Sequence, residues 1–506
     1  MSFGFKPFHG IRTSRSTLFR NPRDPGGAGR AGATGRAGAR PYRTIRLLIW
    51  LYFWLLLWEG ALRKWIFPSL STPLLIVRDP VLILIYLMAL AKGIFPFNRF
   101  VLLTFGLAAL SLGASLLVFD RLGIMLYGLR TNFLHLPLIF LMPKILHRED
   151  VDRIGRWFLW LSLPMTLLVI WQFASPQGAW INAAAGGELG GQMIASEGRI
   201  RPAGIFSFVT GMVSFLSVVA AFLLGGFLDR DKRPNWLHAV TIPSLLLSLV
   251  LSGSRSAIVG VTIIVVAVIL ICARRVSRFG RVVPPAIAGY LFFVALCYLP
   301  IFREGLEVHA ERFRAGGGVE RGIVGRYLGE LGESIDTAVG TPWLGHGLGI
   351  GTNAGAALLT GSRTFLLGES EWSRVVAESG PVLGYAYILL RVAIFAYLLR
   401  VAWEATNRGQ ATPLLLVAAS GVDMISGQFG QPSTLGFAVF TSGLALASAN
   451  SSMFRAVIST ERPRMQRMRG RSSVAEKVLN ERGAIGGSDA VADDDSAADP
   501  EGKRTD

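Results

Sequence analysis

The chain has 506 residues, of which 51% are hydrophobic and 17% are charged, and its formal net charge is +18. This share of charged residues is too small for the surface of a soluble protein of this length. The sequence also contains repeated apolar runs of about 18 residues or more, the length that crosses a bilayer as a helix. A soluble globular enzyme is therefore excluded. Two cysteines and six scattered histidines lack metal-ligand spacing, so no metal is expected.

The N-terminal residues 1–44 are basic and of low complexity. The first 46 residues contain ten Lys or Arg against the single acid Asp24, and residues 25–41 are mostly Gly, Ala and Arg. Such a segment buries too little apolar surface to fold, so we expect it to be disordered. It could bind nucleic acid, or it could be a cytoplasmic arm beside anionic lipid. The hydrophobic chain that follows favours the arm, and no nucleic-acid partner is expected.

The apolar runs predict an all-α, polytopic integral membrane protein with about 12 transmembrane helices. Nine of these helices fall within residues 45–301 and three within 380–452, with a long loop over 302–379 between the two groups. The runs themselves are 45–62, 73–91, 99–118, 122–143, 157–174, 204–227, 237–252, 256–273, 283–301, 380–400, 411–427 and 433–450. Residues 453–506 turn from basic to acidic and are predicted to be a disordered cytoplasmic tail.

The distribution of basic residues predicts the orientation. Lys and Arg concentrate in alternate turns and at both ends of the chain, which places both termini in the cytoplasm by the positive-inside rule. The loop 302–379 has seven Arg and no Lys against ten acids, as expected on the outer side. Arg63, Lys64 and Arg78 are exceptions, because they fall on the outer side against the rule.

Several arginines stand in or beside predicted spans, where a charge is costly and calls for an explanation. Each one alone is best explained by a structural ion pair or by contact with lipid headgroups. Several that converge on the outer face would instead form an anion site, because guanidinium groups bind phosphate oxygens in pairs and stay charged at any pH. The candidates are Arg130, Arg201, Arg255, Arg326 and Arg374.

The loop 302–379 contains two further patterns. Residues 342–355 are glycine-rich, which predicts a turn where the backbone approaches a ligand or the membrane surface closely. In ESEWSRVVAESG (369–380), a helix would place Glu371, Arg374 and Glu378 on one face. Two interpretations of that face remain open. A carboxylate there could act as a general base toward a hydroxyl group, or the three residues could form a surface ion-pair ladder of little energetic value.

At these positions the sequence resembles the O-antigen ligase and polymerase family of bacterial polysaccharide assembly. The likeness covers roughly residues 45–450, and each pattern is weak alone but their order around one long loop is moderately specific. The patterns, in chain order, are EGALRKWIFPSLSTPLLIVRDP (59–80), RPAGIFSFVTG (201–211), SGSRSA (252–257), GRYLGEL (325–331), TPWLGHGLGIG (341–351) and AESGPVLG (377–384).

The resemblance implies a membrane glycosyltransferase with a GT-C-like fold that needs no metal, nucleotide or other cofactor. It implies that Arg201, Arg255 and Arg326 hold the diphosphate of an undecaprenyl-diphosphate donor, and Arg130 is a further candidate. Glu378, Gly380 and Gly384 match a structural motif of the family at the point where the chain re-enters the membrane.

One departure from the family pattern bears on the reaction. Where ligases carry a His-Asn pair, this chain has Glu369 followed by Ser370, and His346 is a poor match for that histidine. The departure argues against ligation to a lipid acceptor and favours a polymerase, with Glu369 or Glu371 as the base and Arg374 orienting it. Glu378 is the less favoured base.

The expected function is polymerisation of undecaprenyl-diphosphate-linked repeat units into exopolysaccharide or O-antigen at the periplasmic face of the bacterial inner membrane. The partners would be the lipid-linked glycan, membrane lipid and other polysaccharide-assembly proteins. Three alternatives stay open: an O-antigen ligase, a transporter of lipid-linked glycan, and a partner without activity in a synthase complex. No inverted repeat of the kind common in transporters is found in the sequence.

Overall fold

The computed structural model describes residues 42–449 except 197, 230–234, 316–324, 362–365 and 369. The predicted disordered tail 453–506, and the predicted arm up to residue 41, lie outside the described residues. The chain divides into two units after Arg43. All elements discussed below lie in the second unit, except that the first residue of α1 belongs to the first unit.

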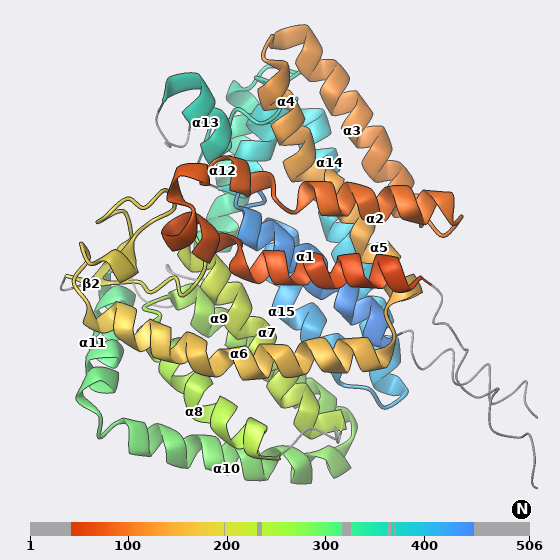
Figure 1. Cartoon of the computed structure of the whole chain (residues 1–506). Helices are drawn as coiled ribbons and strands as arrows, with labels where there is room; N and C mark the ends of the chain where they lie inside the picture. Colours follow the sequence, from red (N-terminus) through yellow and green to blue (C-terminus); the bar gives the residue numbers. More distant parts are fainter. Residues whose placement is uncertain are drawn as a thin grey trace, which may run out of the picture. The chain divides into compact units, whose positions relative to one another are not determined.

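The second unit is built almost entirely of α-helices (Figure 1). The helices are α1 Arg43–Ala61, α2 Asp79–Ala91, α3 Arg99–Val118, α4 Leu122–Leu129, α5 Leu136–Ile145, α6 Arg148–Ala174, α7 Val209–Asp229, α8 Asn235–Leu251, α9 Arg255–Arg274, α10 Phe279–Leu296, α11 Pro300–Ala315, α12 Gly325–Gly340, α13 Asn353–Thr360, α14 Glu371–Asn407, α15 Thr412–Ser426 and a last helix, Pro432–Ala449. Short π-helices extend α1 over Leu62–Ile66 and α4 over Arg130–Leu134. Three-residue to four-residue 3₁₀ helices occupy Pro68–Leu70, Pro73–Ile76, Trp180–Asn182 and Val276–Arg278.

The described residues confirm an all-α chain of membrane-spanning character. They contain 9 helices long and apolar enough to cross a bilayer, or 10 if the pair Leu122–Leu134 and Leu136–Ile145, bent by 42°, is one span. The helices α8 and α15 are apolar but shorter. Every one of the twelve predicted runs overlaps one of these helices. The count of twelve spans stays a prediction, because it requires α8 and α15 to cross the bilayer as well.

Two helices form the buried centre of this unit. In α7 and in the last helix, Pro432–Ala449, 83% and 94% of the apolar window is buried. Small residues let neighbouring groups approach them closely. A Cβ on Gly436 would lie 1.9 Å from the Arg78 guanidinium, and one on Gly443 would lie 2.3 Å from the Met142 sulfur. Outer helices instead expose apolar side chains such as Leu117 and Leu167, as lipid-facing helices do.

The predicted loop 302–379 is largely helical. It contains α11 from its third residue onward, α12, α13 and the first turns of α14. The helix that contains the predicted span 380–400 starts nine residues before it, because α14 begins at Glu371, where the Ser370 hydroxyl accepts a hydrogen bond from the Ser373 amide. Gly380, with φ 79° and ψ 165°, kinks the helix there, and the chain continues as a helix from Pro381.

The segment 175–203, between α6 and α7, carries the only sheet among the described residues. The strands β1 (Ile194–Ser196) and β2 (Arg199–Ile200) pair antiparallel, with Ile194 opposite Ile200. The amide of Arg201 continues this pairing by donating to the carbonyl of Met193. The hairpin thereby fixes the backbone of Arg201 at the point where the chain leaves the outer segment.

The three cations that violated the positive-inside rule are buried inside the protein. Arg63 and Arg78 both pair with Glu59, at 3.4 and 3.1 Å, and Lys64 donates to the Gly204 carbonyl at 2.9 Å. Charges held in this way face protein groups and not the loops that flank the bilayer. Burial in ion pairs and hydrogen bonds explains why these three residues depart from the positive-inside rule. The remaining basic residues still predict the same orientation.

Replacement of Gly380 by alanine should destabilise the protein. Its backbone conformation is essentially restricted to glycine, and a Cβ there would lie 2.1 Å from the Trp343 carbonyl oxygen. We expect Gly380→Ala to lower the free energy of unfolding by at least about 2 kcal/mol. Thermal unfolding of the detergent-solubilised protein measures the change.

Gly106→Ala is the matched control. Gly106 lies in α3, and the position that a Cβ would take there has no other atom within 4 Å, so alanine should be neutral or stabilising by about 0.5–1 kcal/mol. Equal melting temperatures for the two variants would contradict the role assigned to Gly380.

Candidate functional site

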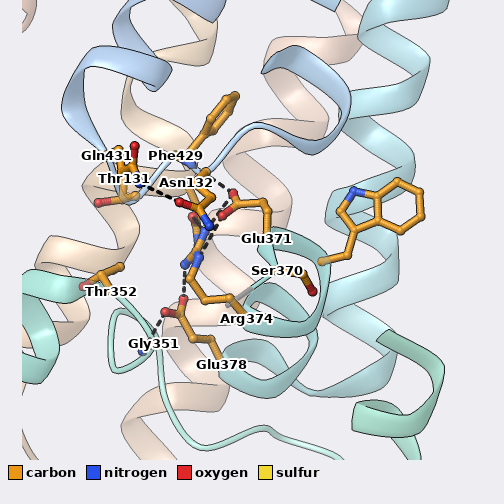
Figure 2. A network of polar contacts seen from close by, with 12 residues as sticks. Thr131, Asn132, Gly351, Thr352, Ser370, Glu371, Arg374, Glu378, Phe429 and Gln431 are labelled. Atoms are coloured by element: carbon orange, nitrogen blue, oxygen red, sulfur yellow. Dashed lines mark hydrogen bonds and ion pairs between the residues drawn. The ribbon is translucent and has the colours of Figure 1, made fainter. Parts of the chain in front are cut away.

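The start of α14 holds a buried network of ion pairs around Arg374 (Figure 2). The Arg374 guanidinium donates to Glu371 at 2.9 and 3.0 Å and to Glu378 at 2.8 Å. It also donates to Asn132 in the π-helix after α4 at 2.9 Å. The predicted placement of Glu371, Arg374 and Glu378 on one helical face is confirmed. These side chains are almost entirely buried, so the arrangement is not the exposed ion-pair ladder that was the alternative.

The carboxylate of Glu371 is saturated with donors. Its Oε1 accepts from Arg391 at 2.7 Å, from Arg374 at 3.0 Å and from the Phe429 amide at 3.3 Å, while Oε2 accepts from Arg374. A buried carboxylate that already accepts four hydrogen bonds, three of them from guanidinium groups, has little capacity left to accept a further proton. The geometry therefore favours a structural role for Glu371, which positions α14, and not a role as a general base.

Arg391 connects this network to the neighbouring helix α15. Besides Glu371, its guanidinium donates to the carbonyls of Met424, Asp423 and Gly427, at 2.8, 3.0 and 2.8 Å. These carbonyls lie at the C-terminal end of α15, where helix carbonyls lack partners within the helix. Arg391 thus caps α15 and fixes the end of that helix against α14.

The glycine-rich segment 342–355 wraps against the kink of α14. Gly347 and His346 donate backbone hydrogen bonds to the carbonyls of Glu378 and Ala377, at 3.0 and 2.9 Å. A Cβ on Gly345 would lie 2.3 Å from the Glu378 carbonyl. The glycines do allow close approach, as predicted, but the neighbours found are the protein's own backbone and not a ligand.

A small polar cavity lies beside Glu371 and Arg374. Its free volume is about 20 Å³, room for about one water molecule. Ser370, Thr352 and Gln431 are among the residues that line it (Figure 2). In this conformation the cavity is too small for a sugar, so it does not define a substrate site by itself.

A second group of charged residues gathers arginines from three separate segments. This arginine cluster consists of Arg201 after β2, Arg255 at the first position of α9 and Arg312 in α11. Gly253 lies between two of them. Arg312 donates to the Gly253 carbonyl at 2.9 Å, and a Cβ on Gly253 would lie 3.8 Å from the Arg201 side chain. With φ 55°, Gly253 turns the chain between α8 and α9 and leaves room for the arginines.

The cluster is strongly electropositive. Burial, followed by the positive charges of Arg201 and Arg255, lowers the pKa of Arg312 to about 10. Arg312 therefore still carries its proton at neutral pH, but at an electrostatic cost that a bound anion would relieve. Burial, with Arg312 nearby, also lowers the pKa of His309, so this histidine adds no positive charge at neutral pH.

Two members of the arginine cluster have no carboxylate partner among the described residues. Within the described residues, neither Arg255 nor Arg312 forms an ion pair, and Arg255 carries a buried Nη1 without a hydrogen-bond partner. Most of the buried arginines elsewhere in the bundle are matched by acids, as Arg374 is by Glu371 and Glu378. Half-buried arginines such as Arg255 and Arg312, with no ion-pair partner among the described residues, are favourable places for an anion to bind.

The structure brings together some of the predicted site residues and separates others. Arg201 and Arg255 both lie within electrostatic range of Arg312. Arg130 is instead buried and paired with Asp79 at 2.5 Å and with the Leu75 carbonyl, which favours a structural role. Arg326 begins α12, but its side chain, like the whole of Glu369, lies outside the described part of the chain. Gly384 packs tightly, since a Cβ there would lie 2.7 Å from the Val376 backbone.

Sequence reasoning missed Arg312, Asn132 and Arg391. An arginine in the apolar run 380–400 is a recognisable signal, and Arg391 could have been selected on that ground. Arg312 offered no such signal, because it is one of several arginines in a charged amphipathic helix. Asn132 is an uncharged residue whose role depends only on the position of α14.

Loss of the Glu371 charge should destabilise the protein. Glu371→Gln keeps the shape of the side chain but leaves Arg374 and Arg391 short of a buried counter-charge. We expect the free energy of unfolding to fall by about 3–5 kcal/mol. Glu404→Gln, in the exposed Arg400–Glu404 pair, is the control and should change it by at most about 0.5 kcal/mol. If Glu371→Gln melts at the wild-type temperature, the structural role of this carboxylate is wrong.

Comparison with known proteins assigns no function to these residues. No protein-family model matches the chain, and no curated protein is similar to it at a significant level. The resemblance to O-antigen ligases and polymerases thus rests on the local sequence patterns, and function has to be argued from the arginine cluster and the elements that hold it.

Proposed function

We propose that the protein is an integral membrane glycosyltransferase that binds the diphosphate of a lipid-linked oligosaccharide at the arginine cluster. One observation carries the proposal: Arg201, Arg255 and Arg312 converge from three segments, and two of them lack a counter-charge within the described residues. Phosphate oxygens suit this cluster, because guanidinium groups bind them bidentately. The apolar helices around the cluster suit a donor with a lipid tail.

The reaction that fits this site is transfer of the donor glycan to a sugar hydroxyl. The hydroxyl oxygen attacks the anomeric carbon, and the bond from this carbon to the diphosphate oxygen breaks. The lipid diphosphate leaves with the bonding electrons and gains negative charge, while the hydroxyl proton passes to a base. Fixed guanidinium groups lower the barrier because they meet the charge that develops on the leaving diphosphate.

The roles of the other site residues follow from their contacts. Arg374, Glu371 and Glu378 are positioning residues, because they hold the kinked start of α14 and the glycine-rich segment in place. Glu369 stands two residues before Glu371 and is the carboxylate we propose as the base. The proposed acceptor is the growing glycan itself, which makes the enzyme a polymerase of the bacterial inner membrane acting on undecaprenyl-diphosphate-linked units at the periplasmic face.

Substitutions in the arginine cluster test the proposal. Arg255→Lys should reduce polymer formation by about 10²-fold or more although the charge is kept, because an ammonium group cannot reproduce bidentate contacts. Arg312→Ala should weaken donor binding, measured separately with lipid diphosphate. Arg303→Ala is the matched control on the same helix, since Arg303 is exposed, and should leave both activity and binding unchanged.

The assay uses purified protein in vesicles with lipid-linked repeat units. Longer lipid-linked chains support a polymerase. Movement of the lipid across the bilayer without elongation would show a transporter, and transfer to a different lipid acceptor would show a ligase. Wild-type elongation by Arg255→Lys and Arg312→Ala together would exclude the cluster as the diphosphate site.

A further inference from the structure

The helix α12, Gly325–Gly340, has an apolar face that is not covered by the described part of the protein. Leu331, Ile335 and Val339 recur at intervals of four residues and form one stripe along this helix. All three are exposed, and Val339 is 86% exposed. Glu333 is exposed on the opposite side of the helix, and Asp336 is exposed at the edge of the stripe, as in helices that lie at a membrane surface. The described residues offer no second layer that would bury the stripe.

This stripe is one wall of an open groove, which we name the α12 groove. The other walls are Trp343, which follows α12, and Pro381 and Tyr385 of α14, and the groove has a volume of about 650 Å³. None of the lining residues is charged. Ser334 fixes the spacing of the two helices through its hydroxyl, which lies 3.3 Å from that of Tyr385. The groove is thus a formed feature between two packed helices.

The groove continues the lipid-facing surface of α14. After the kink at Gly380, residues 381–407 of α14 form a helix about 40 Å long, already more than the hydrocarbon thickness of about 30 Å. The buried turns before the kink are therefore not needed to cross the hydrocarbon. Val382 and Leu389 on the following turns are 61% and 66% exposed and face lipid. Pro381 and Tyr385 belong to the same turns, so the groove opens at the level where hydrocarbon begins.

Trp343 marks the same level. It is 78% exposed beside the groove, and tryptophan is enriched where hydrocarbon meets the headgroups. A single hydrocarbon chain in the groove would account for three features that share it. They are the exposed apolar stripe, the exposed tryptophan and the lipid-facing helix. A soluble protein partner would account for the stripe but not for its continuity with the lipid-facing turns of α14.

We propose that α12 lies in the interface of the bilayer and that the α12 groove holds an acyl chain of a membrane phospholipid. The stripe of Leu331, Ile335 and Val339 contacts hydrocarbon, and Glu333 and Asp336 face water. The segment between the predicted spans is then partly a membrane-associated structure and not a free loop.

Site-directed spin labelling in phospholipid nanodiscs tests this placement. Single cysteines at Ile335, Val339 and Trp343 report on the stripe and the groove, with Glu333→Cys and Asp336→Cys as matched controls on the same helix. The native Cys272 and Cys297 are replaced by alanine to remove background labelling. Collision rates with oxygen, which partitions into hydrocarbon, are compared with those of a water-soluble nickel chelate. Melting temperatures equal to wild type verify folding.

The expected result is a periodic one. Labels at Ile335, Val339 and Trp343 should collide with oxygen several-fold more than with the nickel chelate. A label at 333 should show the reverse, and one at 336, at the edge of the stripe, should lie between the two. Nickel-dominated collisions at Val339 and Ile335 would overturn the proposal by placing the stripe in water. Protection from both reagents there would overturn it as well, because protein would then fill the groove. The labels report membrane contact and not catalysis, so the outcome is independent of glycan transfer.

Discussion

The buried ion pairs of Arg374 are the interaction on which the start of α14 and the segments packed around it depend. One guanidinium connects Glu371 and Glu378 on α14 to Asn132 on the π-helix after α4. Glu378 in turn accepts from the Gly351 amide at 3.0 Å and thereby holds the glycine-rich segment. Removal of one partner would leave a buried charge unmatched, which costs far more than an exposed pair is worth. The kinked start of α14 is rigid for this reason.

The arginines discussed above fall into two groups: those that pair with a carboxylate, and those that have no such partner among the described residues. Arg78, Arg130 and Arg374 are buried and paired with carboxylates, so their charges are neutralised in ion pairs that hold helices together. Arg255 and Arg312 are half-buried and have no carboxylate within the described residues. A fold tolerates such cations only at an electrostatic cost, and the binding of an anion removes that cost. Charge balance is therefore the reason why the proposed substrate site is the arginine cluster and not the buried network on α14.

The arginine cluster and the α12 groove occupy similar positions in the fold. The arginine cluster sits where α9 starts and α11 packs, and the α12 groove sits where the lipid-facing part of α14 starts. A lipid-linked anion has a charged headgroup and a hydrocarbon tail, and it requires both kinds of surface near the membrane boundary. The cluster offers the first kind of surface, and the α12 groove, in which we propose an acyl chain, offers the second.

The sequence by itself determined that the chain is helical and membrane-spanning, because long apolar runs leave the backbone no other way to satisfy its hydrogen bonds in lipid. It also determined that Glu371, Arg374 and Glu378 share a face, since their spacing follows the period of one helix. The meeting of Arg201, Arg255 and Arg312, and the saturation of Glu371 by Arg391, were decided only by the tertiary structure. These groups come from segments far apart in the chain, and their distances depend on how the helices pack, which no local pattern encodes.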